Sequence, residues 1–252
     1  MKNLQHLSYS SVSLWHACPR AHYLKYGLGI RDEPSVAQVY GTAFHQTVQN
    51  ALVNGIRMTE AAENFEEYFL REIDKRRADL TERAILSHIE LGRETLEDEF
   101  SAEIFADIHV SHTNQIEKSI EFWVPGVPIP VLGFIDVIDD MGNLYDIKTS
   151  RSDWDQKRAD EGTQVDFYLT AMDSLSDHRH GGKFTYIIAT KIRPCVYLID
   201  THREGYKEKV YSMVQEMWAG VSSGIVPERD DYLGERCNKC WQVATCRLHK
   251  ND

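Results

Sequence analysis

The spacing of apolar residues changes near residue 115, and this change divides the elements that the chain is expected to form. Over 36–52, apolar residues recur every three or four positions, which predicts an amphipathic helix. Over 59–113 the chain is rich in Ala, Leu, Glu and Arg and poor in Gly and Pro, which predicts two or three helices. A further helix is expected to begin near Ser8, whose side chain can cap it, and to reach Trp15.

After residue 115, short segments rich in β-branched and aromatic residues alternate with helical ones. Helices are expected over 162–175 and 204–222. The strands are expected at 117–124, 131–139, 143–148, 184–190 and 195–200. We therefore expect an α/β fold, in which helices flank one mixed central β-sheet and a helical insertion over 57–115 forms a cap or arm.

Length and composition indicate one folded unit over 1–252. The chain has 252 residues, 42% of them hydrophobic, and no low-complexity stretch marks a linker. Its first residues lack the apolar core of a signal peptide, and no apolar run approaches the roughly 18 residues that span a bilayer. We expect a cytoplasmic protein without a membrane partner.

The loop between the second and third expected strands predicts the placement of two aspartates. Residues 140–142 suit a three-residue hairpin loop, with Gly142 at the position that favours positive φ. Counting back along both strands from such a loop puts Asp136 opposite Asp146, with both side chains on one face. A two-residue loop would shift the register by one and separate the two carboxylates.

Side chains alternate along the third expected strand, so Asp146 and Lys148 share a face while Ile147 points into the core. Carboxylates hold a hard divalent cation, and a neighbouring lysine can neutralise charge that develops during phosphodiester hydrolysis. The alternative is an ordinary hairpin with an exposed aspartate and lysine. Further motifs decide between the two interpretations.

Short motifs occur along the chain in an order that resembles the PD-(D/E)XK nuclease superfamily. They are Gly133-Phe134-Ile135-Asp136, Asp146-Ile147-Lys148 and Gln164-Val165-Asp166-Phe167-Tyr168. Upstream, Gly41-Thr42-Ala43-Phe44-His45 and the cysteines narrow the resemblance to the RecB-like branch that carries an iron–sulfur cluster. That branch includes the AddB nuclease domain, CRISPR-associated RecB-like nucleases and phage exonucleases. The resemblance covers about residues 8–45 and 117–246 and leaves out the helical insertion.

The resemblance implies a restriction-endonuclease-like core and a role for each matching residue. Lys148, with Asp136 and Asp146, would be catalytic, and a helix beside the site would carry Gln164 and Tyr168, which lie four residues apart on one face. These two side chains would bind a phosphate or orient the lysine. The implied metal ligands are His45, Asp136, Asp146 and the carbonyl of Ile147. An imidazole ligand favours Mn(II) over Mg(II) alone.

A further acidic ligand is left open by the sequence. Glu117 and Glu121 both precede the expected hairpin, and either one can face the metal or the solvent. We favour Glu121.

The cysteines predict a second metal centre that joins the two ends of the chain. Cys18 lies near the N-terminus, and Cys237, Cys240 and Cys246 lie close together near the C-terminus. Four thiolates can hold zinc or a 4Fe-4S cluster, and the resemblance favours the cluster. The fifth, Cys195, is interpreted as an apolar core thiol.

The net charge of −11 argues against a protein that binds polyanions over its whole surface, because phosphate contacts need Lys and Arg. It is compatible with a local basic groove. Candidate basic residues for such a groove are Arg20, Lys25, Lys148, Arg151, Lys157 and Arg158.

The function that these features predict is a metal-dependent DNA exonuclease acting on linear or single-stranded DNA, in DNA recombination, repair or phage DNA processing. One alternative is an endonuclease or a CRISPR-type DNA-processing nuclease. Another is a noncatalytic iron–sulfur subunit that binds DNA. The sequence has no Gly-x-x-x-x-Gly-Lys-Ser/Thr loop, so a helicase or recombinase partner would be a separate protein.

Overall fold

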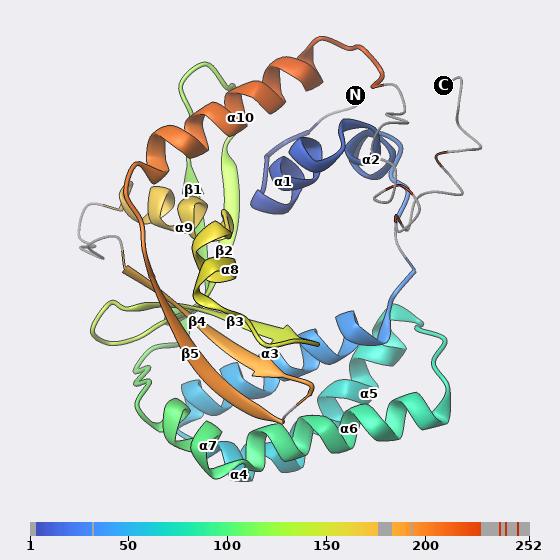
Figure 1. The fold of residues 1–252 in the computed structure, drawn as a ribbon, viewed down its shortest axis with the longest axis vertical. Coiled ribbons are helices and arrows are strands. Elements are labelled where there is room, and N and C mark those ends of the chain that lie inside the picture. Colours follow the sequence, from blue (N-terminus) through green and yellow to red (C-terminus); the bar gives the residue numbers. More distant parts are fainter. Residues whose placement is uncertain are drawn as a thin grey trace.

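The protein is described from a computed structural model that covers residues 4–31, 33–175, 183–192 and 194–227, together with Cys237, Cys240 and Cys246. The remaining residues of the expected 237–246 cysteine segment lie outside this description. Five strands of the described chain form one sheet in the order β1-β2-β3-β4-β5 (Figure 1). Their bounds are β1 Ile116–Phe122, β2 Val131–Ile138, β3 Leu144–Ser150, β4 Lys183–Thr190 and β5 Cys195–His202.

The sheet is mixed, as predicted. β1, β2 and β3 form an antiparallel meander, β3 and β4 are parallel, and β4 and β5 are antiparallel. The parallel pair needs a long crossover, which two helices, α8 (Gln156–Glu161) and α9 (Gln164–Met172), supply.

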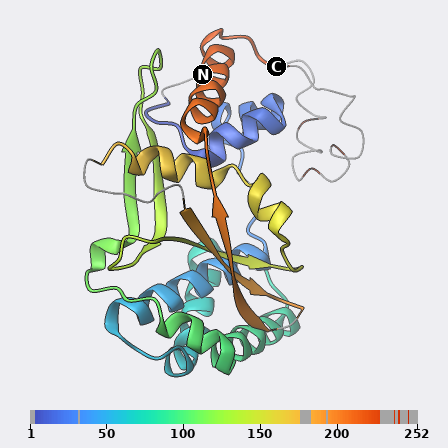
Figure 2. The same cartoon turned by 60° about the vertical axis from the view of Figure 1, so that its left-hand side comes forward.

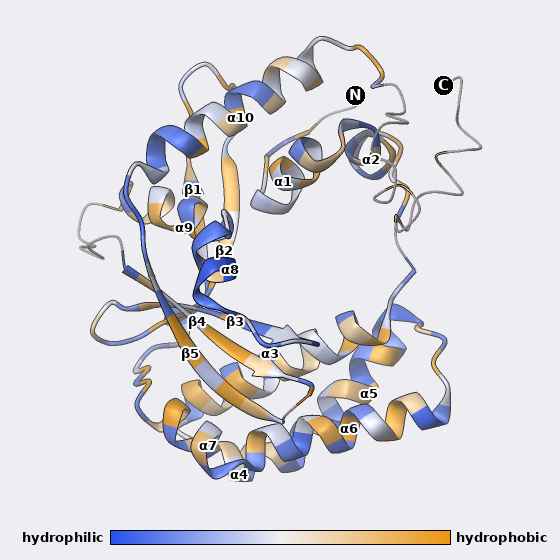
Figure 3. Cartoon of the chain, in the orientation of Figure 1, coloured by the Kyte–Doolittle hydropathy of each residue, from blue (hydrophilic) through white to orange (hydrophobic). Residues whose placement is uncertain are grey.

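Helices cover both faces of the sheet (Figures 1 and 2). On one face lie α1 (Tyr9–Ala17), α9 and α10 (Tyr206–Ser222), and on the other lie α3 (Val36–Asn54) and the helices that follow it. The interior strand β4 contributes to the cores on both faces: Phe184 and Tyr186 face the first, and Ile187 and Ala189 face the second. It is therefore hydrophobic over most of its length (Figure 3). The α/β architecture flanked by helices is confirmed.

Residues 58–106 form a layer of the fold. Four α-helices, and not two or three, occupy this segment, and their packing corrects the interpretation as an arm. Phe65, Phe69 and Leu96 share a buried core with Ile147 and Ile187 of the sheet. The helices are α4 Met58–Ala61, α5 Phe65–Arg76, α6 Glu82–Glu97 and α7 Glu99–Ala106, with a 3-10 turn η2 at Ala62–Asn64.

Local side-chain chemistry explains where two helices of the site region begin. Ser8 Oγ accepts the backbone N–H of Ser11 at 3.2 Å and starts α1, as expected. Ser35 and Gln38 form a reciprocal capping box that starts α3. Between them lie α2 (Pro19–His22), a π-helical turn η1 (Tyr23–Gly27) and a connecting loop, and a 3-10 turn η3 (Thr113–Gln115) precedes β1. No helix in the described part of the chain is long and apolar enough to cross a membrane.

Candidate active site

The site is built where β2 and β3 separate. The hairpin between them has the predicted three-residue loop: Ile138 pairs with Leu144, and Gly142 has a φ of 83°. Asp139 fixes this loop, because its carboxylate accepts the backbone N–H groups of Met141 and Asn143. The register of this loop places Asp136 opposite Asp146.

Regular pairing of β2 with β3 stops at Val137 and Tyr145, one residue before the two aspartates. There, Asp136 Oδ2 accepts the backbone N–H of Ile147 at 2.7 Å. Farther along, β2 pairs with Leu7 through a parallel bridge at Val131. The strands therefore form a fork, and the carboxylate of Asp136 satisfies the backbone group that the fork leaves without a strand partner.

His45 reaches the fork from α3. Its Nδ1 lies 3.6 Å from Asp136 Oδ2, and it forms a hydrogen bond with the backbone of Ile147. Burial lowers the pKa of His45, against the fields of nearby carboxylates, so the imidazole is neutral at neutral pH and able to bind a metal. Gly41 permits this approach of the helix, since a Cβ there would lie 3.2 Å from Thr149 Oγ1 of β3.

Glu117 is the acidic residue that joins His45 and Asp136. One ligand atom from each of the three residues lies within 4.8 Å of the other two. Gln49, four residues after His45 on the same helical face, donates to Glu117 Oε1 at 2.6 Å. The expected Glu121 instead accepts the indole N–H of Trp123. Strand alternation puts Glu117 and Glu121 on the same face of β1, so it does not indicate which of them lies beside His45. No sequence motif marks Gln49.

The backbone of Glu117 is unusual. Its φ of 46° is in the left-handed region, which residues with a side chain rarely adopt. It falls between residues of β1 that pair regularly with β2, at the position opposite Asp136. Such a conformation costs about 1–3 kcal/mol and persists where surrounding contacts impose it, typically at functional sites. Here it directs the Glu117 carboxylate to His45 and Asp136.

Asp146 and Lys148 occupy the other side of the fork. Lys148 Nζ lies 2.5 Å from Asp146 Oδ2, while Ile147 between them is buried in the opposite core, as predicted. Burial is the main cause that raises the pKa of Asp146 to about 6, and the charge of Asp136 adds to it. For Lys148, burial works toward a lower pKa, but Asp146 and Asp136 outweigh it and raise the pKa. The lysine is therefore charged.

The two predicted α9 residues contact each other. Gln164 Nε2 donates to Tyr168 Oη at 2.5 Å. Burial raises the pKa of Tyr168, and the charges of Asp146 and Asp136 raise it further, so the phenol stays protonated beside the carboxylates. An electrostatic interaction with Tyr9, at the start of α1, also raises the pKa of Lys148. No motif around Tyr9 indicates this interaction in the sequence.

The cysteines are free thiols, and each is partly buried. Cys18 Sγ accepts the N–H of Ala21 and so caps α2. Burial is the first cause that raises the pKa of Cys18, and the fields of Cys240 and Cys237 raise it too, which places their thiols near it. The N–H of Cys240 bonds to the carbonyl of Cys237 at 3.2 Å. Among the described residues, the sulfur atoms of these thiols do not lie as close to one another as the ligand atoms of His45, Glu117 and Asp136.

The arrangement of carboxylates, histidine and lysine at the fork agrees with a comparison with known families, in which the model of the PD-(D/E)XK nuclease superfamily matches residues 6–247. The chain belongs to the PD-(D/E)XK nuclease superfamily. No match was found among curated proteins. Among solved structures, the crystal structure of SSO0001 is similar at 17% identity and a TM-score of 0.38, over 90% of this chain and 92% of that one.

Nucleases of this superfamily use divalent metals, and the residues at the fork fit such an ion. Carboxylates are ligands of both Mg(II) and Mn(II), and the imidazole favours the transition metal Mn(II). Within the described chain, Oδ1 of buried Asp146 has no hydrogen-bond partner, and Oδ2 pairs with Lys148. Burial also raises the pKa of Asp136 to about 6. A cation would compensate both buried carboxylates.

Proposed function

We propose that this chain is a metal-dependent deoxyribonuclease that acts as an exonuclease on linear or single-stranded DNA. The observation that supports it best is the fork itself, where His45, Glu117 and Asp136 converge beside the Asp146–Lys148 pair in a chain of the nuclease superfamily. Preference for free ends is inferred from the resemblance to stand-alone phage exonucleases. The associated processes would be DNA recombination, repair or phage DNA processing.

We assign the metal to His45, Asp136, Asp146 and the carbonyl of Ile147, and add Glu117 from its position. When bound, the divalent cation supplies a Lewis acid for the phosphate and for the attacking water. Because the imidazole of His45 is neutral, no proton has to leave its ring before a cation binds. An imidazole ligand also favours Mn(II).

Lys148 is proposed as the catalytic lysine. Its charged Nζ, held by Asp146, would stabilise the negative charge that grows on the phosphate oxygens as the bond breaks. Tyr168 is protonated and can donate its O–H to a phosphate oxygen, with Gln164 holding the ring in place. In this proposal the two residues position the substrate.

We further propose that the chain belongs to the RecB-like branch and that Cys18, Cys237, Cys240 and Cys246 hold a 4Fe-4S cluster. The thiol chemistry and the proximity of Cys237 and Cys240 to Cys18 support it. Such a cluster would join the chain ends and stabilise the fold. Anaerobic purification followed by iron, sulfide and zinc analysis tests this proposal. Four irons per chain would support the cluster, whereas one zinc per chain would show that the site is a zinc site.

Activity is tested with Mn(II) and end-labelled DNA. Anaerobically purified protein is incubated with linear single and double strands and with circular controls, alongside Lys148→Ala and the surface control Lys183→Ala, at an exposed lysine paired with Asp200. Loss of linear substrate only, abolished by Lys148→Ala and retained by Lys183→Ala, supports the exonuclease. Cleavage of circles replaces it with the endonuclease alternative, and DNA binding without cleavage indicates the noncatalytic subunit. We also propose a cytoplasmic location and a separate helicase or recombinase partner. Pull-down from the native host would test the partner.

A further inference from the structure

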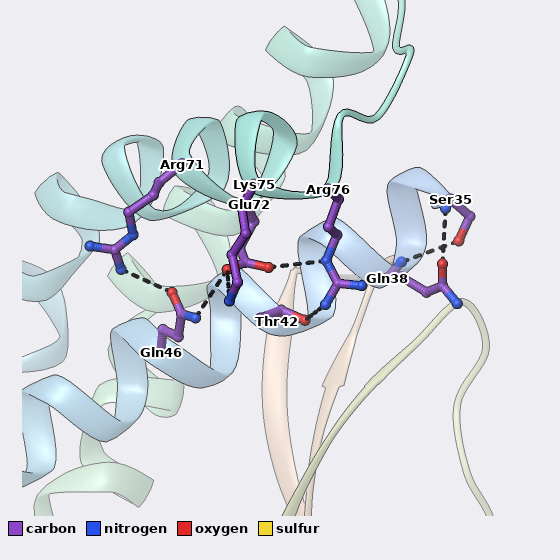
Figure 4. A network of polar contacts seen from close by, with 8 residues as sticks. All are labelled: Ser35, Gln38, Thr42, Gln46, Arg71, Glu72, Lys75 and Arg76. Atoms are coloured by element: carbon purple, nitrogen blue, oxygen red, sulfur yellow. Dashed lines mark hydrogen bonds and ion pairs between the residues drawn. The ribbon is translucent and has the colours of Figure 1, made fainter. Parts of the chain in front are cut away.

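Two cations on α5, Lys75 and Arg76, are held in fixed positions beside α3, the helix that carries His45 (Figure 4). Arg76 donates from Nε to Glu72 Oε2 and from Nη2 to Thr42 Oγ1, both at 3.0 Å. Lys75 Nζ donates to Glu72 Oε1 at 3.0 Å. Gln46 of α3 also contacts Glu72, so the network joins α5 to the helix that carries His45.

Glu72 is the centre of this network. Its side chain is 1% exposed, whereas those of Lys75 and Arg76 are 68% and 35% exposed. Burial opposes ionisation of Glu72, but hydrogen bonds from Lys75 and Arg76 hold its pKa below the ordinary value. A buried, ionised carboxylate thus orients two cations whose heads remain accessible to solvent.

The network borders the same pocket as the metal ligands. Arg76, Thr42 and Gln46 line it together with His45, Gln49 and Glu117. Thr42 and His45 are three residues apart on one face of α3, which separates their Cβ atoms by about 5–6 Å. The guanidinium is therefore bonded to a residue about one helical turn from the proposed metal ligand His45. In the described chain, Arg76 Nη1 has no hydrogen-bond partner and is available to a ligand.

We propose that this pocket is a phosphate subsite for the DNA strand. In it, Arg76 binds a backbone phosphate next to the one being cut, Lys75 adds positive charge, and Glu72 is the positioning residue. The inference rests on the proposed nuclease function. A chain with a net charge of −11 repels DNA overall, so cations fixed beside the site would have a large effect on binding. The guanidinium fork suits phosphate geometry.

Arg76→Gln tests the subsite against the control Arg93→Gln. Arg93 also pairs with a glutamate, Glu66, in the same helical layer, but it does not line the pocket. Binding of a labelled single-stranded oligonucleotide is measured with Mn(II) in the Lys148→Ala background over a range of salt concentrations. Arg76→Gln is expected to weaken binding roughly tenfold and to reduce the slope of log K against log salt by about 0.7, the value for one phosphate contact on a single strand. Equal behaviour of the two variants overturns the proposal.

Glu72→Gln separates positioning from net charge. It removes a negative charge near the strand, so a general charge effect predicts tighter DNA binding, whereas loss of positioning predicts weaker binding. We expect binding to weaken by roughly threefold to tenfold, as for lost charge-assisted contacts. In the enzyme that retains Lys148, Glu72→Gln should raise KM and change kcat little. Tighter binding overturns the positioning role. Thermal denaturation of each variant shows whether it is folded, and Arg76→Gln tests the subsite even if Glu72→Gln unfolds.

The two proposals fail in different ways. If the unsubstituted enzyme does not cut DNA with Mn(II), or if Lys148→Ala cuts normally, the proposed function is wrong. If the unsubstituted enzyme cuts DNA and Arg76→Gln has the same KM and salt slope as Arg93→Gln, the nuclease stands and the phosphate subsite is wrong.

Discussion

The carboxylate of Asp136 accepts the backbone N–H of Ile147 at 2.7 Å, at the point where β2 and β3 stop pairing. One side chain thus completes the ladder of the sheet and lies 3.6 Å from the proposed ligand His45. Substitution of Asp136 would therefore disturb the backbone and the metal site together. Asp146 makes no such backbone bond in the described chain, so it is the better position at which to separate metal binding from folding.

Asp146→Asn is expected to stabilise the metal-free protein above pH 6. The fold raises the pKa of Asp146 from 3.8 to about 6, mainly through burial, so the folded chain binds this proton more tightly than the unfolded chain. The resulting stability is fully present below pH 4 and is lost as the pH rises through 6. At pH 8 in EDTA, urea unfolding should show the variant to be more stable by about 1–3 kcal/mol.

The same variant should lose most of the rise in Tm that Mn(II) gives the unsubstituted protein, because a proposed ligand is gone. Asp79→Asn, at an exposed aspartate in the helical layer, serves as the control and should change neither measurement. A variant that is less stable than the unsubstituted protein in EDTA at pH 8 would contradict the prediction.

Glu117→Gly is expected to be more stable than Glu117→Ala. Glycine normally weakens a strand, but the φ of 46° at this position favours it. The difference should be about 1 kcal/mol in urea unfolding of the metal-free proteins. Both variants should bind Mn(II) more weakly, since both lack the carboxylate. Greater stability of the alanine variant would show that the left-handed backbone is not retained.

Gly41→Ala is expected to lower nuclease activity several-fold with little loss of stability. The new Cβ would lie 3.2 Å from Thr149 Oγ1 and push α3, with His45, away from β3. The higher helix propensity of alanine, worth about 1 kcal/mol, offsets part of the strain. Thr149→Ala removes the opposing atom, so the double variant should recover activity. Activities that multiply without recovery would show that the two residues are not coupled.

Gly92→Ala is expected to destabilise the whole protein by about 1–3 kcal/mol or more, the usual cost of overpacking. A Cβ at this position of α6 would overlap the ring of Phe65, whose contact atoms lie 2.1–2.5 Å away. Because that ring shares a core with the sheet, denaturation should remain one cooperative transition with a lower midpoint. A separate early transition would show that the helical layer unfolds by itself.

Several features of this molecule follow from the sequence because they depend on neighbouring residues. Gly142 indicated the loop length, the loop fixed the register, and the register placed Asp136 opposite Asp146. Alternation then separated Ile147 from Lys148. Strand periodicity and helix capping are local in the same sense, so the strands and the start of α1 were predicted closely.

Other features depend on contacts between distant residues and were not predictable. The left-handed backbone of Glu117 and its hydrogen bond from Gln49 of α3 depend on tertiary contacts, and strand alternation puts Glu117 and Glu121 on the same face, so the sequence could not show that Glu117 is the residue beside His45. The packing of the helical insertion depends on close approaches such as that of Gly92 to Phe65. Its composition predicted two or three helices where the structure has four, and it did not indicate the face of the sheet that they cover.

Leu7 has an importance that its single-residue bridge conceals. It donates its N–H to Pro130 and accepts that of Leu132, each at 2.8 Å, along the stretch of β2 that β3 has left. Without this bridge, β2 would present an unprotected strand edge, the kind of surface on which identical chains add to one another. The fork that shapes the proposed metal site thus opens a stretch of strand edge, and one residue ahead of the first helix covers it.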